Sequence, residues 1–486
     1  MNQPTITLVE LAPTEFGRLD EKLMKDVYSR FENPARATPL LHSIFNNAGY
    51  KDVTSINTKF NPTPGRLTTE NWSQFKRSDY VLWSSITRTQ SQTAEAAEKV
   101  KSINHHVKNI IGGSHATYTD EECLEGPFDV VVRHEGDHTI VPLIERLENN
   151  ESLEGLLGIT FKNNSHIERN PVRPPLTVEE FSNLPPPVYD TATLKGMSIP
   201  VMIGSRGCPF DCSFCGVNDF YGPEYRKKSP EAFVRNLKYL EKTAQRGKGI
   251  FIGDDNFIGK MAETKILLDM MIESGLKRKY GIQIPALNAR ADGLAEHLYK
   301  ANVRYAFLGF EALDQESLES VDKKSNEKIN TEAAVALGDA GIWRHGMFIL
   351  GLGKQDAKYM DYLLDWTLKY CDSVQFFSLD PIPGTKETKK LKEEGRIIRN
   401  DYHLHDGQHV LVLPENISPL DLQVKSLELH ERFYSMKNIR NIMSSPKPSW
   451  KFVINPYGKH IAKSVRKSRQ MQEHIEFLKR YEHKFY

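Results

Sequence analysis

Three of the five cysteines lie close together in the segment GSRGCPFDCSFCG, residues 204–216. Cys208, Cys212 and Cys215 have the spacing CxxxCxxC, and thiolates at this spacing on one loop can ligate a single metal centre. The cysteine count is odd, and Cys123 and Cys371 are isolated, so a disulfide framework is not expected. A reducing compartment fits better, and there a tight cysteine cluster usually serves metal binding or catalysis.

The number of ligands separates two kinds of metal centre. A structural zinc site takes four protein ligands, whereas this segment offers three thiolates, and no histidine lies between Cys215 and His297. Cys123 or Cys371 could complete a zinc site, although nothing local recruits either. Three thiolates suit a 4Fe–4S cluster that leaves one iron open, and an open iron can bind and activate a small molecule.

The elements that must position these cysteines form an alternating series. Strand-like segments alternate with helical stretches from residue 196 to about 390, and six such β/α units indicate a partial barrel. In α/β barrels the chemistry lies on the loops at the carboxyl ends of the strands, and Cys208 falls just past the first strand. The strand-like segments are SIPVMIGSRGC, GKGIFIGDDNF, YGIQIPALNARAD, VRYAFLGFEAL, IWRHGMFILGLG and SVQFFSLDPIPG.

An earlier series of strands and helices precedes the barrel. Buried-type strands such as TITLVEL, SDYVLWSS and FDVVVRHEGD alternate with helical stretches, which predicts a parallel sheet covered by helices. Ligands of such sheets bind beyond the carboxyl ends of the strands. Those ends carry small and polar residues, which are Ser84, Ser85, Gly112, Gly113, Ser114, His115, Glu135 and Gly136. Gly112 and Gly113 could also be no more than a tight turn.

The segment CPFDCSFC, with Phe214 directly before the third cysteine, resembles the signature of the radical S-adenosylmethionine (SAM) superfamily. Later segments fall at the strand ends where that superfamily has its SAM-binding motifs. The resemblance implies that GDDNF holds the methionine amino group of SAM, that NARAD reaches its ribose or carboxylate, and that GFEAL contributes a further contact. The residues implied are Phe214, Gly253, Asp254, Asp255, Asn288, Arg290 and Glu311.

The resemblance also implies a mechanism. The open iron of the cluster would chelate SAM, and one electron would cleave the sulfonium to give methionine and a 5′-deoxyadenosyl radical. That radical would abstract hydrogen from an unactivated C–H bond inside a barrel that excludes water. An electron donor such as flavodoxin or ferredoxin would supply the electron, and replacing any of the three cysteines by alanine should abolish the chemistry.

The first series resembles the cobalamin-binding domain that precedes the barrel in one large radical SAM subclass. The resemblance therefore implies that cobalamin is a further cofactor, held by Ser84, Ser85, Gly112, Gly113, His115, Glu135 and Gly136. The DxHxxG motif that ligates cobalt in many cobalamin domains is missing, as in many members of this subclass. His134 and Asn57 also depart from the usual residues. His115 and His134 could face cobalt, but a hydrogen-bonding role is more common for a histidine near a loop.

Three functions follow from this resemblance. The first is methylation of an unactivated carbon or phosphorus centre, with cobalamin carrying the methyl group. The second is a radical SAM cyclisation, oxidation or rearrangement without methyl transfer. The third is a non-catalytic iron–sulfur or cobalamin-binding protein, which the SAM-type motifs disfavour. A small molecule, lipid or peptide could be the substrate.

Charge and hydropathy set further expectations. A net charge of +1 makes nucleic-acid binding unexpected, and the N-terminus shows no signal-peptide pattern, so a cytoplasmic protein is expected. Residues 440–486 carry eleven Lys and Arg against three Glu. The basic helical stretch 459–485 could contact an anionic membrane, but packing on the barrel through its apolar side is favoured. The basic segment YRKKSP is expected to be a solvated loop, although Arg226 could hold a carboxylate or phosphate.

Together these patterns predict an α/β chain of four parts. Residues 1–170 form a Rossmann-like domain of the cobalamin-binding type, and residues 171–195 form a proline-rich linker. Residues 196–390 form a partial (β/α)6 barrel of the TIM type, and residues 391–486 are mainly helical.

Overall fold

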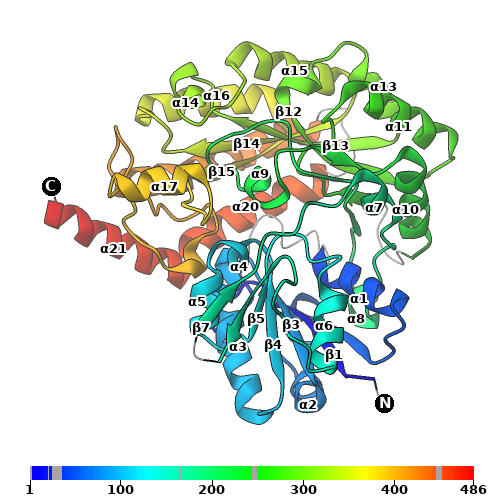
Figure 1. Cartoon of the computed structure of the whole chain (residues 1–486). Helices are drawn as coiled ribbons and strands as arrows, with labels where there is room; N and C mark the ends of the chain where they lie inside the picture. The colour runs from blue at the N-terminus through cyan, green and yellow to red at the C-terminus, as the bar shows by residue number, and fades with distance from the viewer. Residues whose placement is uncertain are drawn as a thin grey trace.

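A computed structural model describes residues 3–19, 21–24, 36–164, 166–243, 249–444 and 451–485. Two sheets lie one above the other, the first drawn in blue and cyan and the second in green and yellow (Figure 1). The predicted fold class is confirmed, because both sheets are built mainly from parallel strands with helices against them and the chain ends in helices.

The first sheet has the strand order β2-β1-β3-β4-β5-β6-β7, in which the pairs from β2 to β5 are parallel. The antiparallel hairpin β6–β7 at its edge was not predicted. The strands are β1 (Ile6–Glu10), β2 (Val53–Asn57), β3 (Tyr80–Ser84), β4 (Lys108–Gly112), β5 (Val130–Val132), β6 (Ile159–Asn163) and β7 (His166–Arg169). The order 2-1-3-4-5 belongs to doubly wound folds, which bind ligands at the carboxyl ends of their strands.

Helices cover both faces of this sheet, and each face has its own apolar core. Phe75, Trp83 and Phe128 belong to one core, and Phe45 and Leu143 belong to the other. Because both faces are buried, the strands read as continuous apolar runs rather than alternating ones. The helices are α1 (Ala37–Asn47), α2 (Thr69–Arg77), α3 (Gln90–Ile103), α4 (Ser114–Tyr118), α5 (Asp120–Glu125) and α6 (Ile140–Glu148), with the short turns η1 (Glu15–Gly17), η3 (Thr58–Phe60) and η4 (Thr87–Thr89).

The proline-rich linker contains two short helices, α7 (Val178–Asn183) and α8 (Thr191–Gly196). The Thr177 hydroxyl accepts from the Glu180 N–H while the Glu180 carboxylate accepts from the Thr177 N–H, which starts α7 with a capping box. Asp190 caps α8 by accepting from the Thr193 N–H. The prolines of the linker lie outside these two helices, so the helices are short but can form.

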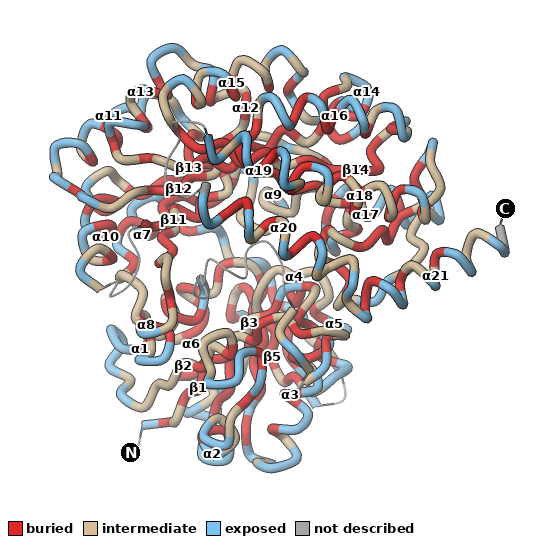
Figure 2. The backbone as a smooth tube through the Cα atoms, turned by 180° about the vertical axis from the view of Figure 1, so that it is seen from behind, coloured by how far each residue is buried: buried red, intermediate tan, exposed pale blue. Residues whose placement is uncertain are grey.

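The second sheet has six parallel strands in the order β15-β14-β13-β12-β11-β8, as the six predicted units require. They are β8 (Val201–Met202), β11 (Gly249–Ile252), β12 (Lys279–Pro285), β13 (Val303–Glu311), β14 (Trp343–Leu350) and β15 (Ser373–Ser378). A small antiparallel pair, β9 (Ser205–Arg206) with β10 (Arg226–Lys227), follows β8. The largest apolar core lies between the strands and the outer helices, and the strands are largely buried (red in Figure 2).

The helices of the barrel are α9 (Val217–Tyr221), α10 (Pro230–Thr243), α11 (Met261–Glu273), α12 (Ala286–Ala289), α13 (Leu294–Lys300), α14 (Gln315–Glu319), α15 (Glu327–Asp339), α16 (Ala357–Tyr370) and α17 (Lys386–Glu393).

The C-terminal region holds η5 (Tyr402–Leu404), α18 (Pro419–Phe433), α19 (Met436–Ser444), α20 (Lys451–Lys467) and α21 (Arg469–Phe485). The basic stretch 459–485 falls in two helices, α20 and α21, that pack on α18. The predicted burial of its apolar side is confirmed at Ile461 and Leu478, although the contact is with α18 rather than with the barrel strands. The segment around η5 contacts the first domain, where the Tyr402 hydroxyl donates to the Glu122 carboxylate at 2.8 Å. Among the described residues, no helix has the length and apolar character that a membrane crossing requires.

Candidate functional site

The three clustered cysteines lie on the cluster loop, residues 207–216, between β9 and α9. Gly207 begins this loop with a φ of +82°, and a Cβ there would lie 2.4 Å from the Glu224 carbonyl oxygen. Only glycine fits both the backbone conformation and the space. The Cys215 N–H donates to the Cys212 carbonyl at 3.0 Å, so residues 212–215 form a turn.

Burial raises the pKa of all three thiols, to about 11 for Cys212 and about 12 for Cys215. The nearby Cys208 also raises the pKa of Cys212, and both of these thiols raise that of Cys215. Without a metal the three side chains are therefore neutral at pH 7, and cluster assembly must displace their protons. Among the described residues, no three His, Cys, Asp or Glu side chains surround one ion position. A 4Fe–4S cluster takes its thiolates on different irons, so its ligands do not share one such position.

The loop is held from the far end of the barrel. The Ser213 hydroxyl donates to the Glu387 carboxylate at 2.7 Å, and Lys386 pairs with Asp211 at 2.5 Å. Both partners belong to α17, which follows the last barrel strand. The cluster loop is therefore fixed by residues more than 170 positions away in the chain.

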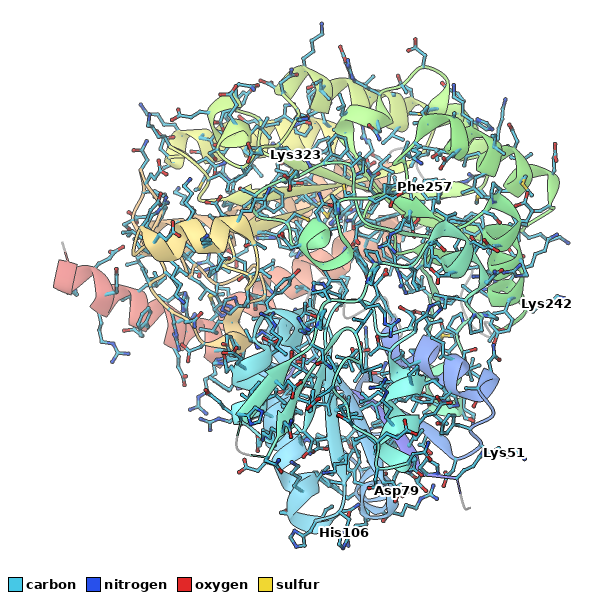
Figure 3. The ribbon with its side chains drawn as sticks, in the orientation of Figure 1. Lys51, Asp79, His106, Lys242, Phe257 and Lys323 are labelled. Atoms are coloured by element: carbon cyan, nitrogen blue, oxygen red, sulfur yellow. The ribbon has the colours of Figure 1, made fainter. Side chains whose placement is uncertain are left out.

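Lys323 lies beside the thiols and was not predicted (labelled in Figure 3). Its ammonium group is 2.9 Å from the Glu311 carboxylate, and Glu311 has a φ of +64°, which is strained for a side-chain-bearing residue. Burial lowers the pKa of Lys323, but Glu311 and the Cys212 thiol outweigh burial and hold it above its usual value. A permanent positive charge therefore adjoins the cluster loop, and Glu311 keeps it there.

The predicted SAM contacts divide into two groups. Phe214 and Asp255 line a cavity beside Cys215, and Gly253 adjoins it, since a Cβ there would lie 3.5 Å from the Arg36 guanidinium carbon. Asp254 turns the other way and accepts from the Gly204 N–H at 2.6 Å, with 1% of its surface exposed. Successive residues of an extended segment point to opposite sides, so only one of the two carboxylates faces the cavity.

Three further predicted contacts, Asn288, Arg290 and Glu311, do not line this cavity. The Asn288 amide donates to the Ile258 carbonyl. Arg290 pairs at 2.9 Å with Glu332 of α15, and both side chains are about two-fifths exposed. The structure therefore brings Asp255 to the cavity and leaves Arg290 on the outer helix layer.

The cavity has a volume of about 670 Å³ and lies between the two sheets. The cluster loop contributes Phe214 and Cys215 to its wall, and the loop after β15 contributes Ile382 and Pro383. The first domain contributes the carboxyl ends of its strands, which are Ser84, Gly112, Gly113, Ser114, His134, Glu135, Gly136 and Asp137. One cavity is thus bounded by Cys215 of the cluster loop and by strand ends on which sequence analysis placed cobalamin.

Gly112, Gly113 and Gly136 form what we call the glycine rim of the cavity, and at Gly113 only glycine fits. Gly113 has a φ of +108°, and a Cβ there would lie 2.2 Å from the Ser85 carbonyl oxygen. Ser84 faces the cavity, whereas Ser85 is buried and donates to the Gln90 amide oxygen at 2.9 Å. Gly112 and Gly113 both line the cavity, and the close contact at Gly113 is with the Ser85 backbone.

The two candidate histidines differ in position. His115 is buried outside the cavity, with its ring 4.6 Å from that of Tyr402, and burial lowers its pKa to about 4. His134 lines the cavity, and its Nδ1 lies 2.9 Å from the Phe220 carbonyl oxygen of α9. Of the two, only His134 adjoins the space between the domains.

Glu135 lies at the rim, but its carboxylate is bound within the protein. Arg206 contacts Glu135 at 3.0 Å and Asp137 at 2.8 Å, and Arg226 contacts Glu135 at 3.0 Å. All four side chains are less than 10% exposed. We call Glu135, Asp137, Arg206 and Arg226 the interdomain ion network, because its acids belong to the first domain and its arginines flank the cluster loop.

The interpretation of YRKKSP as a solvated loop is wrong. Arg226, Lys227 and Lys228 are at most 6% exposed. The Lys227 ammonium donates to the Phe257 carbonyl at 2.7 Å and lies 4.2 Å from the centre of that ring (Phe257 is labelled in Figure 3). Arg226 pairs with Glu135, a carboxylate of the protein itself, and the predicted contact to a carboxylate or phosphate of a ligand stays a prediction. Sequence distance hid this pairing, since 91 residues separate the two.

The site fits the cofactors that the sequence implies. Below the glycine rim the cavity continues as an apolar cleft between the sheet and the helices α1 and α6, lined by Leu40, Leu41, Leu82, Ile110, Val132 and Ile140. The buried Tyr118 hydroxyl lines the cavity without a hydrogen-bond partner among the described residues. A polar group left unpaired at the wall of an apolar space is expected where a ligand completes it.

Comparisons with known proteins agree with this division. The profile of the Radical SAM superfamily matches residues 202–367, and that of the B12 binding domain matches residues 30–144. An uncharacterised methyltransferase of Pyrococcus horikoshii is 28% identical over 312 residues, which are 62% of this chain and 67% of the relative. An anaerobic magnesium-protoporphyrin IX monomethyl ester cyclase of Cereibacter sphaeroides is 26% identical over 379 residues, which are 74% of this chain and 60% of the relative.

A solved structure shares the whole arrangement. The cobalamin-dependent SAM radical enzyme OxsB with aqua-cobalamin bound has a TM-score of 0.70 at 16% identity, over 98% of this chain and 75% of that one. At this identity the likeness shows a common fold. The matched profiles and the cysteine motif therefore show that residues 202–367 form a Radical SAM superfamily domain and that a B12 binding domain, residues 30–144, precedes it.

Proposed function

We propose that the protein is a cobalamin-dependent radical SAM methyltransferase that acts on an unactivated carbon or phosphorus centre. The observation that carries this proposal is the shared cavity, in which Cys215 and Phe214 face the glycine rim of the first domain. Chemistry that passes between a cluster-bound SAM and a corrin needs both in one water-poor space.

Each group of residues has a role in this proposal. Cys208, Cys212 and Cys215 hold the cluster, and the Asp255 carboxylate receives the ammonium group of SAM. Gly112, Gly113 and Gly136 let the backbone approach the corrin, and the apolar cleft below them accepts its nucleotide tail. When bound, the cluster with SAM supplies a 5′-deoxyadenosyl radical and cobalamin supplies a transferable methyl group. The interdomain ion network keeps the two halves of the site in register.

A second candidate is radical cyclisation or oxidation without methyl transfer. It is supported by the relative from Cereibacter sphaeroides, whose name is that of a cyclase and which matches across both domains. The chain spans 67% and 60% of the two relatives described above, so their activities reach this protein only as proposals. In either case the partners would be a small organic substrate and a low-potential electron donor.

Anaerobic reconstitution tests the proposal. The protein is loaded with iron, sulfide and hydroxocobalamin, its visible spectrum is recorded, and SAM and dithionite are added. We expect iron–sulfur and corrin absorption and the release of 5′-deoxyadenosine, with Cys212→Ala as the control that loses the cluster. A fully clustered protein that does not cleave SAM would contradict the radical SAM assignment. Cleavage without cobalamin binding would favour the second candidate.

A further inference from the structure

The helices α19 and α20 carry an unusual concentration of positive charge. Residues 433–472, which we call the acid-free segment, contain nine Lys and Arg and no Asp or Glu. Most of this segment forms two consecutive helices that contact each other, and in the rear view they lie on the face turned to the viewer (Figure 2). The positive charge of the acid-free segment therefore lies on one part of the protein surface rather than being spread over the molecule.

Four of these cations are exposed and form no ion pair with any described residue: Lys437, Arg440, Lys463 and Lys467. The acidic residues that flank the acid-free segment in sequence, Glu431 and Glu473, already form ion pairs. Glu431 pairs with Arg466 at 3.1 Å, and Glu473 pairs with Arg469 at 2.8 Å. The positive potential of this surface is therefore not cancelled by its neighbours.

Apolar side chains stand among these cations. Met436, Met443, Phe452 and Val453 are 47%, 36%, 54% and 48% exposed. On α19, Met436, Arg440 and Met443 follow the spacing i, i+4, i+7 and therefore share one face. On α20, one stripe runs from Phe452 and Val453 through Pro456 to Lys463 and Lys467. Each helix thus mixes apolar and cationic groups on its outer side.

The opposite sides of both helices are fixed in the protein. Ile454 of α20 is buried against Tyr305, Phe307 and Trp343, which lie at the inner side of the barrel. Ile439 of α19 is 3% exposed, and the buried Asn438 amide donates to the Phe433 carbonyl at 2.7 Å. Since these contacts anchor the inner faces, the exposed apolar side chains cannot turn inward without breaking them.

We propose that the outer face of α19 and α20 docks on the surface of an anionic lipid bilayer. Cations attract the phosphate layer, and apolar side chains next to them enter the boundary between headgroups and acyl chains. A nucleic acid would satisfy the cations but leave the methionines and Val453 in water. The bilayer is the occupant that uses both kinds of group. This surface shares Lys463 and Lys467 with the basic stretch 459–485, but its apolar groups lie on α19 and at the start of α20, outside that stretch. The inference does not rest on the proposed function.

Flotation with lipid vesicles tests this proposal on the full-length protein. Vesicles of phosphatidylcholine alone are compared with vesicles rich in phosphatidylglycerol, at low and at high salt. We expect binding to the anionic vesicles only, weakened by salt because exposed charges are screened. Lys437→Glu/Arg440→Glu should weaken binding about 25-fold or more, since each cation near an anionic surface contributes roughly fivefold and is here reversed.

Two further variants complete the test. Met443→Ser/Val453→Ser keeps the charge and should weaken binding about tenfold. Lys51→Glu/Lys242→Glu makes the same net change of charge at two exposed lysines in other parts of the molecule and should bind almost as well as the unmodified protein (Figure 3). All these positions are exposed, so the variants should keep their far-UV circular dichroism and melting temperature.

Three results would overturn the proposal. The first is no binding to anionic vesicles. The second is a binding loss in the Lys51/Lys242 variant equal to that of Lys437→Glu/Arg440→Glu, which would indicate net charge alone. The third is full binding by Met443→Ser/Val453→Ser together with tight, Lys437-dependent binding of single-stranded RNA, which would assign the surface to a polyanion.

Discussion

Removing Arg206 should destabilise the protein by about 3–5 kcal/mol, because it would leave a buried charge without its partner. Arg206 makes contacts of 2.8–3.0 Å with Glu135 and Asp137, and its guanidinium carbon lies 4.9 Å from the centre of the Phe181 ring. In Arg206→Met, Glu135 keeps Arg226, whereas no other guanidinium or ammonium contact to Asp137 is found among the described residues. The Asp137 carboxylate is 7% exposed, so water does not replace the lost contact.

The matched control is Arg290→Met. Arg290 also contacts a carboxylate at 2.9 Å, but both partners are about two-fifths exposed, and such pairs contribute about 0–1 kcal/mol. The same chemical change therefore has a large effect in one place and a small one in the other. A third variant, Arg206→Met/Asp137→Leu, removes the stranded charge and should recover part of the loss, because apolar replacements of buried ion pairs are often neutral.

Equilibrium urea unfolding of the three variants, followed by far-UV circular dichroism and tryptophan fluorescence, measures these differences. Because the network joins two domains, the two probes should coincide in the unmodified protein and separate in Arg206→Met. Equal, small losses for Arg206→Met and Arg290→Met would refute the reasoning. So would a double variant no more stable than Arg206→Met, since the loss would then not come from an uncompensated charge.

Further predictions concern single residues of the site. Asp255→Asn should weaken SAM binding about 10–100-fold in equilibrium dialysis with the clustered protein, whereas Asp254→Asn should change it by no more than a few-fold. Equal losses in the two variants would contradict the conclusion that only the Asp255 carboxylate faces the cavity. Burial raises the pKa of Asp254 from 3.8 to about 6, so folding stability falls as pH rises from about 4 to 6. Asp254→Asn removes this loss and should gain about 3 kcal/mol in urea unfolding at pH 8 and almost nothing at pH 4; the same gain at both pH values would exclude titration as its cause. Gly113→Ala should abolish corrin absorption after reconstitution and destabilise the fold by about 1–3 kcal/mol, because its Cβ would meet the Ser85 carbonyl at 2.2 Å. Corrin binding that survives in Gly113→Ala would refute the role of the glycine rim.

Sequence patterns predicted the parts of the site that depend on local structure. Strand periodicity placed Gly112, Gly113 and Gly136 at strand ends, and parallel strands bring such ends to one edge of a sheet, where all three line the cavity. The spacing of the cysteines predicted a shared loop, because residues so close in sequence cannot lie far apart. These inferences need only the chain direction and a short segment.

Other features depend on contacts between distant segments. Arg226 pairs with Glu135, 91 residues earlier, and the Ser213 hydroxyl donates to Glu387, 174 residues later. No local sequence pattern predicts contacts between residues so far apart. Asp254 and Asp255 are neighbours whose side chains point to opposite sides, and the sequence does not say which one faces the cavity. Arg290 was predicted at the end of β12, but the short helix α12 separates it from that strand, and it pairs with Glu332 of α15. Lys323 lies in a loop with no motif of its own.

Several contacts join the first domain to the rest of the chain, including those at the interdomain ion network, at Tyr402, and between the Phe16 N–H and the Gln470 amide oxygen. The interdomain ion network binds the first domain through ion pairs beside the cluster loop, and the Tyr402 hydroxyl binds it through a hydrogen bond to Glu122 on α5. A corrin held in the cavity between the two domains should exchange slowly, because separation of the domains around it would require these contacts to break together. Cofactor acquired during folding would then be retained through many rounds of dilution, and apo-protein made without it would load slowly.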